Sequence, residues 1–226
     1  MFHSKVRPII IPQYEHGRLA GTLAQHWGNE NFDRPVLDFS SFVNGVALHD
    51  WHYGFYDNLP ISGADEADWL AITRRGMNLR FDDPVADIVA KLHLRRLLSF
   101  QHTPQRLAMM AEVDQIVAAR LPETGYQRAV FDWADKITGF CDFVAFHFSF
   151  EAPYERTMMV CARIENDAET ALTYRIKEGG SVEIDPWPLA VPFITGNLLG
   201  FADDGYPELL RPTVVPFYVS APQVNV

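Results

Sequence analysis

The stretch Val43-Asn44-Gly45-Val46-Ala47-Leu48-His49-Asp50 is an apolar segment that ends in an adjacent histidine and aspartate. A neutral imidazole nitrogen beside a carboxylate oxygen suits iron, manganese, zinc or nickel better than calcium. Two ligands do not complete a metal site, so partners must come from other parts of the chain. The alternative interpretation is that His49-Asp50 is a chance dipeptide at the end of a helix.

The composition is that of an ordinary globular chain that can bury a large core. The chain has 226 residues, of which 48% are hydrophobic and 21% are charged, and this length favours one compact unit. The net charge of -10 argues against non-specific nucleic-acid binding, which needs a positive surface. The chain has two cysteines, Cys141 and Cys161, and no apolar run of the length that a signal peptide or membrane span needs. These features predict a cytoplasmic protein that does not bind membranes.

Helical patterns dominate the first 150 residues. Apolar residues at helical spacing predict helices over about 14–27, 41–50, 63–75, 84–101, 105–120 and 125–148. The pairs Asp83-Pro84 and Thr103-Pro104 are typical helix starts, with a capping side chain before proline. Gly28 is a typical stop for the first helix.

Strand patterns appear only beyond residue 150. Residues 170–177 alternate in polarity, 178–180 form a turn into 181–184, and 190–200 and 213–220 read as extended segments. Three or four antiparallel strands of this length do not easily fold alone, so we expect them to pack on the helices. The sequence therefore predicts a mainly α fold with a small C-terminal antiparallel β subdomain, α+β overall. Residues 1–150 would form the helical core and 151–226 the β-rich part of one structural unit.

Candidate partners for His49 and Asp50 lie on the first and last predicted helices. His16 falls in the middle of the apolar stripe of the first helix, where it is either a ligand or a core histidine bonded to a carbonyl. On the last helix Asp135 and Asp142 share a face, with Asp132 nearby. A carboxylate on an inner face is costly unless it is paired or metal-bound. Periodicity alone does not choose among these three aspartates, and a surface salt bridge is the alternative for Asp135.

The segment Trp51-His52-Tyr53-Gly54-Phe55-Tyr56 is rich in aromatic rings. Because it follows His49-Asp50 directly, it either walls a pocket beside the metal ligands or simply caps the core. The first alternative makes Trp51, His52 and Tyr53 candidates for substrate contacts.

The order of His16, then His49-Asp50, then a late helical aspartate resembles the HD-domain superfamily of metal-dependent phosphohydrolases. In that superfamily the ligands come from separate helices of an all-α core, so the resemblance implies an HD-domain-like helical core here. It also implies Asp135 as the late ligand, because that aspartate typically lies in a segment like Ala134-Asp135-Lys136-Ile137. Two-metal members use further histidines, for which His102 is the first candidate and His93 the second, and a single metal is equally acceptable.

A closer resemblance is to a mainly bacterial family defined by a domain of unknown function. Three segments carry it: QYEHGRLAGTLAQHWG at 13–28, VALHDWHYGFYDNLP at 46–60 and DPWP at 185–188. Many members follow His-Asp with a Gly-Trp pair, whereas this chain has His52, Tyr53 and Gly54 in that region. The resemblance covers most of the chain and implies no substrate.

These observations lead to one expected function and two alternatives. A divalent transition metal held by His16, His49, Asp50 and Asp135 would lower the pKa of a bound water and polarise a phosphoryl group, and Asp50 would orient that water. Lys136 is a candidate cationic contact to phosphate. We therefore expect a metal-dependent phosphohydrolase acting on a small anionic substrate, a phosphoester or nucleotide. The alternatives are an HD-type di-iron oxygenase and a non-catalytic small-ligand-binding protein, and a homo-oligomer is compatible with all three.

Overall fold

The computed structural model describes residues 1–57, 65–165 and 169–222. Its helices are α1 (Gln13–Gln25), α2 (Phe39–Ala47), α3 (Glu66–Asn78), α4 (Pro84–Leu98), α5 (Pro104–Arg120) and α6 (Arg128–Phe148), with the 3-10 turns η1 (Trp51–Tyr56) and η3 (Leu121–Glu123). Its strands are β1 (Phe2–His3), β2 (Ile9–Ile11), β3 (Tyr154–Cys161), β4 (Glu169–Lys177), β5 (Ser181–Asp185), β6 (Phe193–Ala202) and β7 (Pro212–Ser220).

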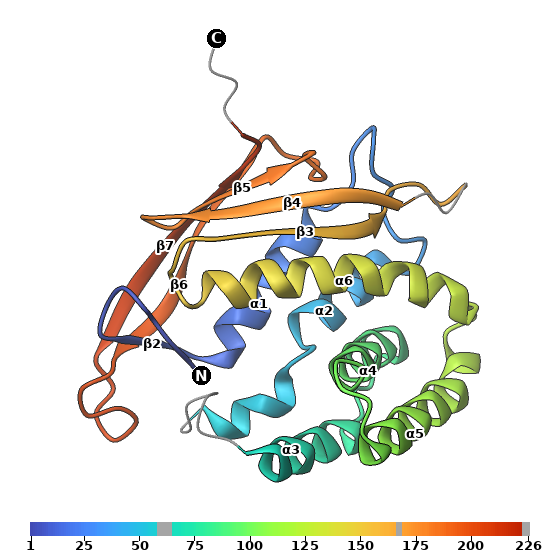
Figure 1. Ribbon diagram of the computed structural model, residues 1–226. Helices are drawn as coiled ribbons and strands as arrows, with labels where there is room; N and C mark the ends of the chain where they lie inside the picture. The colour runs from blue at the N-terminus through green and yellow to red at the C-terminus, as the bar shows by residue number, and fades with distance from the viewer. Residues whose placement is uncertain (58–64, 166–168, 223–226) are drawn as a thin grey trace.

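The strands form one curled, mixed sheet in the order β1-β2-β6-β7-β5-β4-β3. Of the strand pairs in the described residues, β5 and β7 run parallel and the others antiparallel. The helices lie on one side of this sheet (Figure 1). Burial alternates along β7, as expected where one face of a strand meets a core and the other meets solvent.

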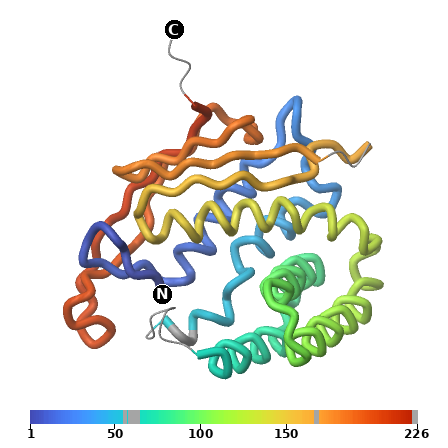
Figure 2. Tube along the Cα trace, in the orientation of Figure 1, coloured from blue at the N-terminus to red at the C-terminus, as the bar shows by residue number. Residues whose placement is uncertain are grey.

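The prediction of a mainly α, HD-domain-like core with a small C-terminal antiparallel subdomain is wrong. The fold is α+β with a seven-stranded sheet, and this sheet begins with the first residues of the chain. Figure 2 shows the N-terminal segment lying along the C-terminal strands, where β2 pairs with β6 through Ile9 and Ala202. The run Ile9-Ile10-Ile11 is buried throughout and too short to show alternation. Its partner lies about 190 residues away, so local sequence did not reveal the strand.

The helix signals of the sequence are confirmed. The Asp83 side chain accepts hydrogen bonds from the backbone N–H groups of Val85 and Ala86 at the start of α4, and Thr103 caps α5 in the same way. Such caps satisfy N–H groups that have no partner within the helix. No helix in the described ranges has the length and apolar content needed to cross a lipid bilayer.

One apolar core joins the helices to the inner face of the sheet. It includes Phe140 and Phe148 of α6, Leu172 of β4 and Val215 of β7, all nearly inaccessible to solvent. The helices α1 and α6 lie side by side against this face, and α2 and α4 pack beneath them (Figure 1). This packing brings α1, α2, α4 and α6 together at one point, where polar side chains interrupt the core.

Candidate metal centre

Two glycines allow α1 to approach the end of α2 very closely. A Cβ atom at Gly17 would lie 2.6 Å from the carbonyl oxygen of Ala47, and one at Gly21 would lie 2.6 Å from the Ala47 Cβ. Any side chain at these positions would push the helices apart. The close approach sets the His16 ring edge-to-face against the His49 ring, with 4.9 Å between ring centres.

Five buried polar residues meet where these four helices converge. Histidine and aspartate side chains make up the whole group, and they are His16 from α1, His49 and Asp50 from the turn after α2, His93 from α4, and Asp142 from α6. Two sets within it, His16-His49-Asp142 and His49-Asp50-His93, each place one donor atom per residue within 4.8 Å of the others. We call the five residues the His/Asp cluster.

The two carboxylates of the cluster face the histidine rings at short range. Asp142 Oδ1 lies 3.0 Å from His16 Nε2 and 3.3 Å from His49 Nε2. Asp50 Oδ2 lies 3.5 Å from His16 Nδ1 and 3.7 Å from His49 Nε2. Nitrogen and oxygen atoms of four side chains therefore point at a common centre.

The tautomer of His49 leaves a lone pair directed at this centre. Its Nδ1 lies 2.5 Å from the carbonyl oxygen of Val46, to which it must donate because that oxygen can only accept. Burial lowers the pKa of His49, which keeps the ring neutral, so Nε2 carries no proton. Within the described residues this buried Nε2 has no hydrogen-bond partner, although two carboxylates face it. Lone pairs that face one another in a buried site need a cation between them.

His93 is held in the opposite orientation by Arg96. The Arg96 Nη2 donates to His93 Nδ1 at 2.9 Å, and an arginine is always a donor. His93 Nε2 is then the protonated nitrogen and donates to Asp50 Oδ1 at 2.8 Å. His93 thus fixes one oxygen of Asp50, and the other, Oδ2, is directed to the centre of the cluster.

The charges of the cluster follow from the same contacts. Burial alone would raise the pKa of Asp50, but the surrounding histidines outweigh it and hold the pKa below its ordinary value. Against the effect of burial, Asp50 and Asp142 also attract a second proton to His93 and raise its pKa, but the Arg96 donor occupies Nδ1 and opposes that proton. Despite burial, the surrounding histidines hold the pKa of Asp142 well below its ordinary value as well, so both carboxylates are ionised at neutral pH.

The spacing of the cluster atoms fits a transition metal. Bonds of 2.0–2.2 Å to histidine nitrogen and carboxylate oxygen, at angles of about 90–110°, place neighbouring ligand atoms roughly 2.8–3.6 Å apart. With His16 Nε2 as the ligand, Asp142 Oδ1 lies 3.0 Å from it and 3.3 Å from His49 Nε2, and both separations lie in this range. Asp50 Oδ2 lies 3.7 Å from His49 Nε2, just beyond the range, and its 3.5 Å contact is to the other ring nitrogen of His16. The predicted ability to hold a metal is thus supported by a buried donor set, of which His16, His49 and Asp50 are members.

Two of the predicted ligands lie elsewhere. Asp135 sits two turns before Asp142 on α6, partly exposed, and forms an ion pair with Arg96. His102 is exposed in the short connection between α4 and α5. The structure brings Asp142 to the cluster instead of Asp135, and His93 instead of His102. Both residues were among the alternatives that the sequence left open.

The predicted substrate contacts are also divided. Trp51 is exposed beside Asp50, whereas His52 and Tyr53, also in η1, are buried. The His52 ring packs so closely on α3 that a Cβ at Gly76 would lie 2.6 Å from it. Lys136 forms an ion pair with Glu169.

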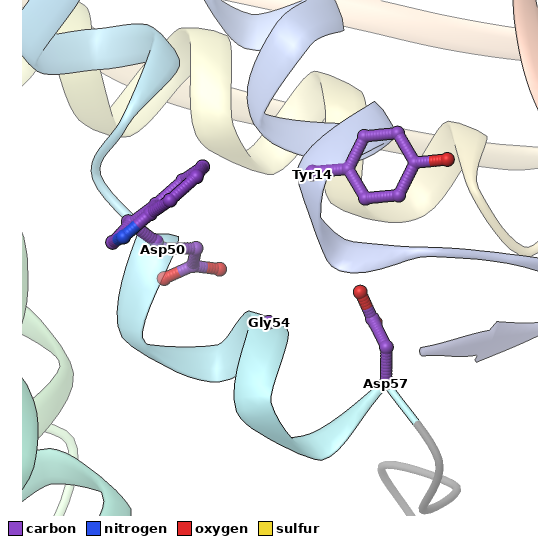
Figure 3. A pocket seen from close by; sticks show the side chains of 5 residues that line it. Tyr14, Asp50, Gly54 and Asp57 are labelled. Carbon is purple, nitrogen blue, oxygen red and sulfur yellow. The ribbon is translucent and has the colours of Figure 1, made fainter.

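The cluster opens to solvent through Asp50. This residue lines a hollow of about 530 Å³ together with Tyr14 and Gly54, and Figure 3 shows their arrangement around it. A small molecule in the hollow would reach the carboxylate of Asp50 directly. The His16 ring, by contrast, is covered by the ring of Phe2 from β1.

The sequence contains a signal for Asp142 that periodicity misses. Asp142 is the one Asp, Glu, Lys or Arg between Ile137 and Phe150, whereas Asp135 has charged neighbours within one turn. An isolated charge in an otherwise apolar helix must be buried with a partner or a metal. The role of Arg96 had no such signal, because its carboxylate partners, Asp135 and Asp142, come from another helix.

The fold and the cluster define an α+β protein with a buried histidine-aspartate centre between four helices. Within that class, the chain belongs to the family described as "Protein of unknown function (DUF3891)", whose model matches residues 2–198. The predicted membership of a family with a domain of unknown function is confirmed. No curated protein and no solved structure matches the chain, and nothing in these comparisons links it to the HD-domain superfamily.

Proposed function

We propose that the His/Asp cluster binds one divalent transition metal and that the protein is a metal-dependent phosphohydrolase for a small phosphoester or nucleotide. The observation that carries the proposal is the unpartnered Nε2 of His49, which faces the carboxylates of Asp50 and Asp142 in a buried site. A proton at the centre would satisfy one such contact, whereas a metal ion satisfies all of them at once.

The assigned ligands are a ring nitrogen of His16, His49 Nε2, Asp50 Oδ2 and Asp142 Oδ1. A metal ion there would supply a water of lowered pKa and polarise a phosphoryl oxygen. Asp50 reaches the hollow, so its carboxylate is placed to orient that water. His93 holds Asp50 in position through the other oxygen, and hydrogen bonds of this kind stabilise the orientation of metal ligands.

The charge balance favours an anionic substrate. Asp50 and Asp142 offset the charge of a divalent ion, and Arg96 offsets Asp135, with which it is paired. The loaded centre then carries no net negative charge that would repel a phosphate.

One metal fits the described ligands better than the two that a di-iron oxygenase needs. The two candidate ligand sets share His49, and the Nδ1 of this ring is already bonded to Val46. Its single lone pair, on Nε2, can bind one ion only. His49 therefore binds a single ion, and His93, whose Nε2 donates to Asp50, supports a ligand of that ion instead of binding a second one.

Elemental analysis of the purified protein tests the centre. We expect about one transition metal ion per chain in the wild type, its loss in His49→Ala, and its retention in His102→Ala, which removes an exposed histidine. Hydrolysis of a panel of phosphoesters by the loaded wild type, absent in His49→Ala, then tests the activity. A wild type that cannot be loaded with iron, manganese, zinc or nickel would contradict the whole proposal. A loaded wild type that hydrolyses no phosphoester would contradict only the assigned reaction.

A further inference from the structure

The hollow beside Asp50 is bordered by two aromatic side chains from different elements. Tyr14 lies on α1 two residues before His16, and Trp51 follows Asp50 in the chain. Both residues, with Asp50, border the hollow of about 530 Å³ and a second, smaller hollow of about 200 Å³. The two rings thus flank the route by which a small molecule reaches Asp50.

Both rings are unusually open to solvent for their size. Trp51 is 56% exposed and Tyr14 is 46% exposed. Aromatic side chains bury large apolar areas when they are covered, and they stack on other planar rings. Stacking of one nucleic-acid base on an aromatic side chain changes affinity by about 5- to 150-fold. A planar ring in this hollow would therefore gain affinity from surfaces that otherwise face water.

The charged groups around the hollow determine which part of a ligand fits there. Asp57 also borders it, and Figure 3 shows its side chain directed towards Tyr14, at the other end of η1 from Asp50. Asp57 is paired with the N-terminal ammonium group of Met1 and accepts from the backbone N–H of Gln13.

Arg18, which lines the smaller hollow, is held in an ion pair by Glu15. The described lining residues thus offer no unpaired cation to a negative group, so the part of the ligand that enters the hollow is uncharged. An anionic group would sit at the metal centre.

We propose that this hollow is a subsite for an uncharged planar aromatic ring, stacked against Trp51 and Tyr14, which forms the alcohol part of the phosphoester substrate. The ring belongs either to an aryl alcohol or to a nucleoside, and both present the same flat apolar faces. That the ring is part of a substrate rests on the proposed hydrolase function, whereas the ring subsite itself is defined by its own residues.

Gly54 provides a way to fill the subsite without touching the metal ligands. It borders the hollow, and a Cβ added there would meet no atom of the described structure within 4 Å. The Gly54→Leu side chain would therefore extend into the space that the ring needs. Trp51→Ala removes one stacking surface. Phe100→Ala is its control, because Phe100 lies just after the C-terminal end of α4, is 57% exposed and is not among the described residues that line the hollow.

The test measures ring binding apart from turnover. Titration calorimetry with 1-naphthol, adenosine and glycerol is carried out on metal-loaded and chelator-treated wild type. We expect 1-naphthol or adenosine, but not glycerol, to bind saturably in both states. The affinity should fall at least fivefold in Trp51→Ala and Gly54→Leu and stay unchanged in Phe100→Ala, with metal content equal in all four proteins. Tighter binding of 1-naphthol would identify an aryl ring as the ligand, and tighter binding of adenosine would identify a nucleoside.

Kinetics then separate the subsite from the reaction. With 1-naphthyl phosphate or adenosine monophosphate, Gly54→Leu and Trp51→Ala should raise KM at least fivefold more than they raise the KM for glycerol phosphate. If neither ring compound binds, or if both variants bind it as tightly as the wild type, the ring subsite is refuted. Ring binding without hydrolysis of any phosphoester would support the subsite and contradict the proposed reaction. Equal turnover of aromatic and glycerol phosphates, unaffected by Gly54→Leu, would support the proposed reaction and contradict the ring subsite.

Discussion

The assignment of Asp142 as the late ligand is tested by a matched pair of substitutions on α6. Asp142 lies within 3.4 Å of His16, His49 and His93, whereas Asp135 contacts Arg96 alone among charged groups of the described chain. Asp142→Asn keeps the shape of the side chain but removes its charge from the centre. Asp135→Asn makes the same chemical change two turns away.

The expected magnitudes follow from ligand linkage. At free metal equal to 100 times the wild-type Kd, binding stabilises the fold by about 2.7 kcal/mol. Loss of the contacts that merely support a ligand weakens metal binding by about 10- to 100-fold, so loss of a ligand should reach at least the upper figure. The stabilisation by the same metal concentration then falls to about 0.4 kcal/mol. For a chain of this size the difference lowers the metal-induced rise in Tm by roughly 5–9 °C.

The same reasoning gives a small effect for the control. The ion pair of Asp135 with Arg96 is partly exposed, and such pairs contribute about 0.2–1 kcal/mol. Asp135→Asn should thus lower the Tm of the metal-free and the metal-loaded protein alike, by at most about 4 °C, and leave the metal-induced rise in Tm unchanged. Thermal denaturation with and without manganese or zinc, beside metal analysis of each variant, measures both quantities. A wild-type response in Asp142→Asn together with a lost response in Asp135→Asn would refute the assignment, and a wild-type response in both would refute a metal centre at the cluster.

Two further predictions concern Gly17 and Arg96, which support the cluster, and a third concerns His147 of α6. Gly17→Ala should destabilise the protein by about 1 kcal/mol, because overpacking costs about 1–3 kcal/mol and the higher helix propensity of alanine returns about 1 kcal/mol. It should also weaken metal binding, whereas the control Gly54→Ala should change neither stability nor metal binding. A Gly17→Ala protein as stable as Gly54→Ala would contradict the close contact between α1 and α2. In urea unfolding, Arg96→Met should lower the free energy of unfolding by about 3–5 kcal/mol, because it leaves the buried Asp142 without its cation. The control Arg95→Met, whose ion pair is exposed, should lower it by at most about 1 kcal/mol. Equal losses in the two variants would show that Arg96 is not needed at the cluster. Burial lowers the pKa of His147, so the unfolded chain takes up a proton there first and the free energy of unfolding falls as the pH drops below about 6.5; His147→Gln should make this decline shallower between pH 7 and 5, and an unchanged slope would contradict it.

Local sequence determined the helices and the first three residues of the cluster, His16, His49 and Asp50. Apolar periodicity placed His16 inside α1, and Asp83 and Thr103 are caps whose hydrogen bonds reach only two or three residues along the chain. The adjacent pair His49-Asp50 pointed to a metal without knowledge of its partners. These features depend on interactions within a few residues, so the sequence displays them directly.

The sheet and the completion of the cluster were decided only by the tertiary structure. Strand β2 is three residues long and becomes a strand because β6 supplies its hydrogen-bond partners from the other end of the chain. Asp135 and Asp142 lie on the same face of one helix, and the choice between them depends on where α1, α2 and α4 cross it. That crossing is set by the contact of Gly17 with Ala47, and such long-range packing has no periodic signature in the sequence.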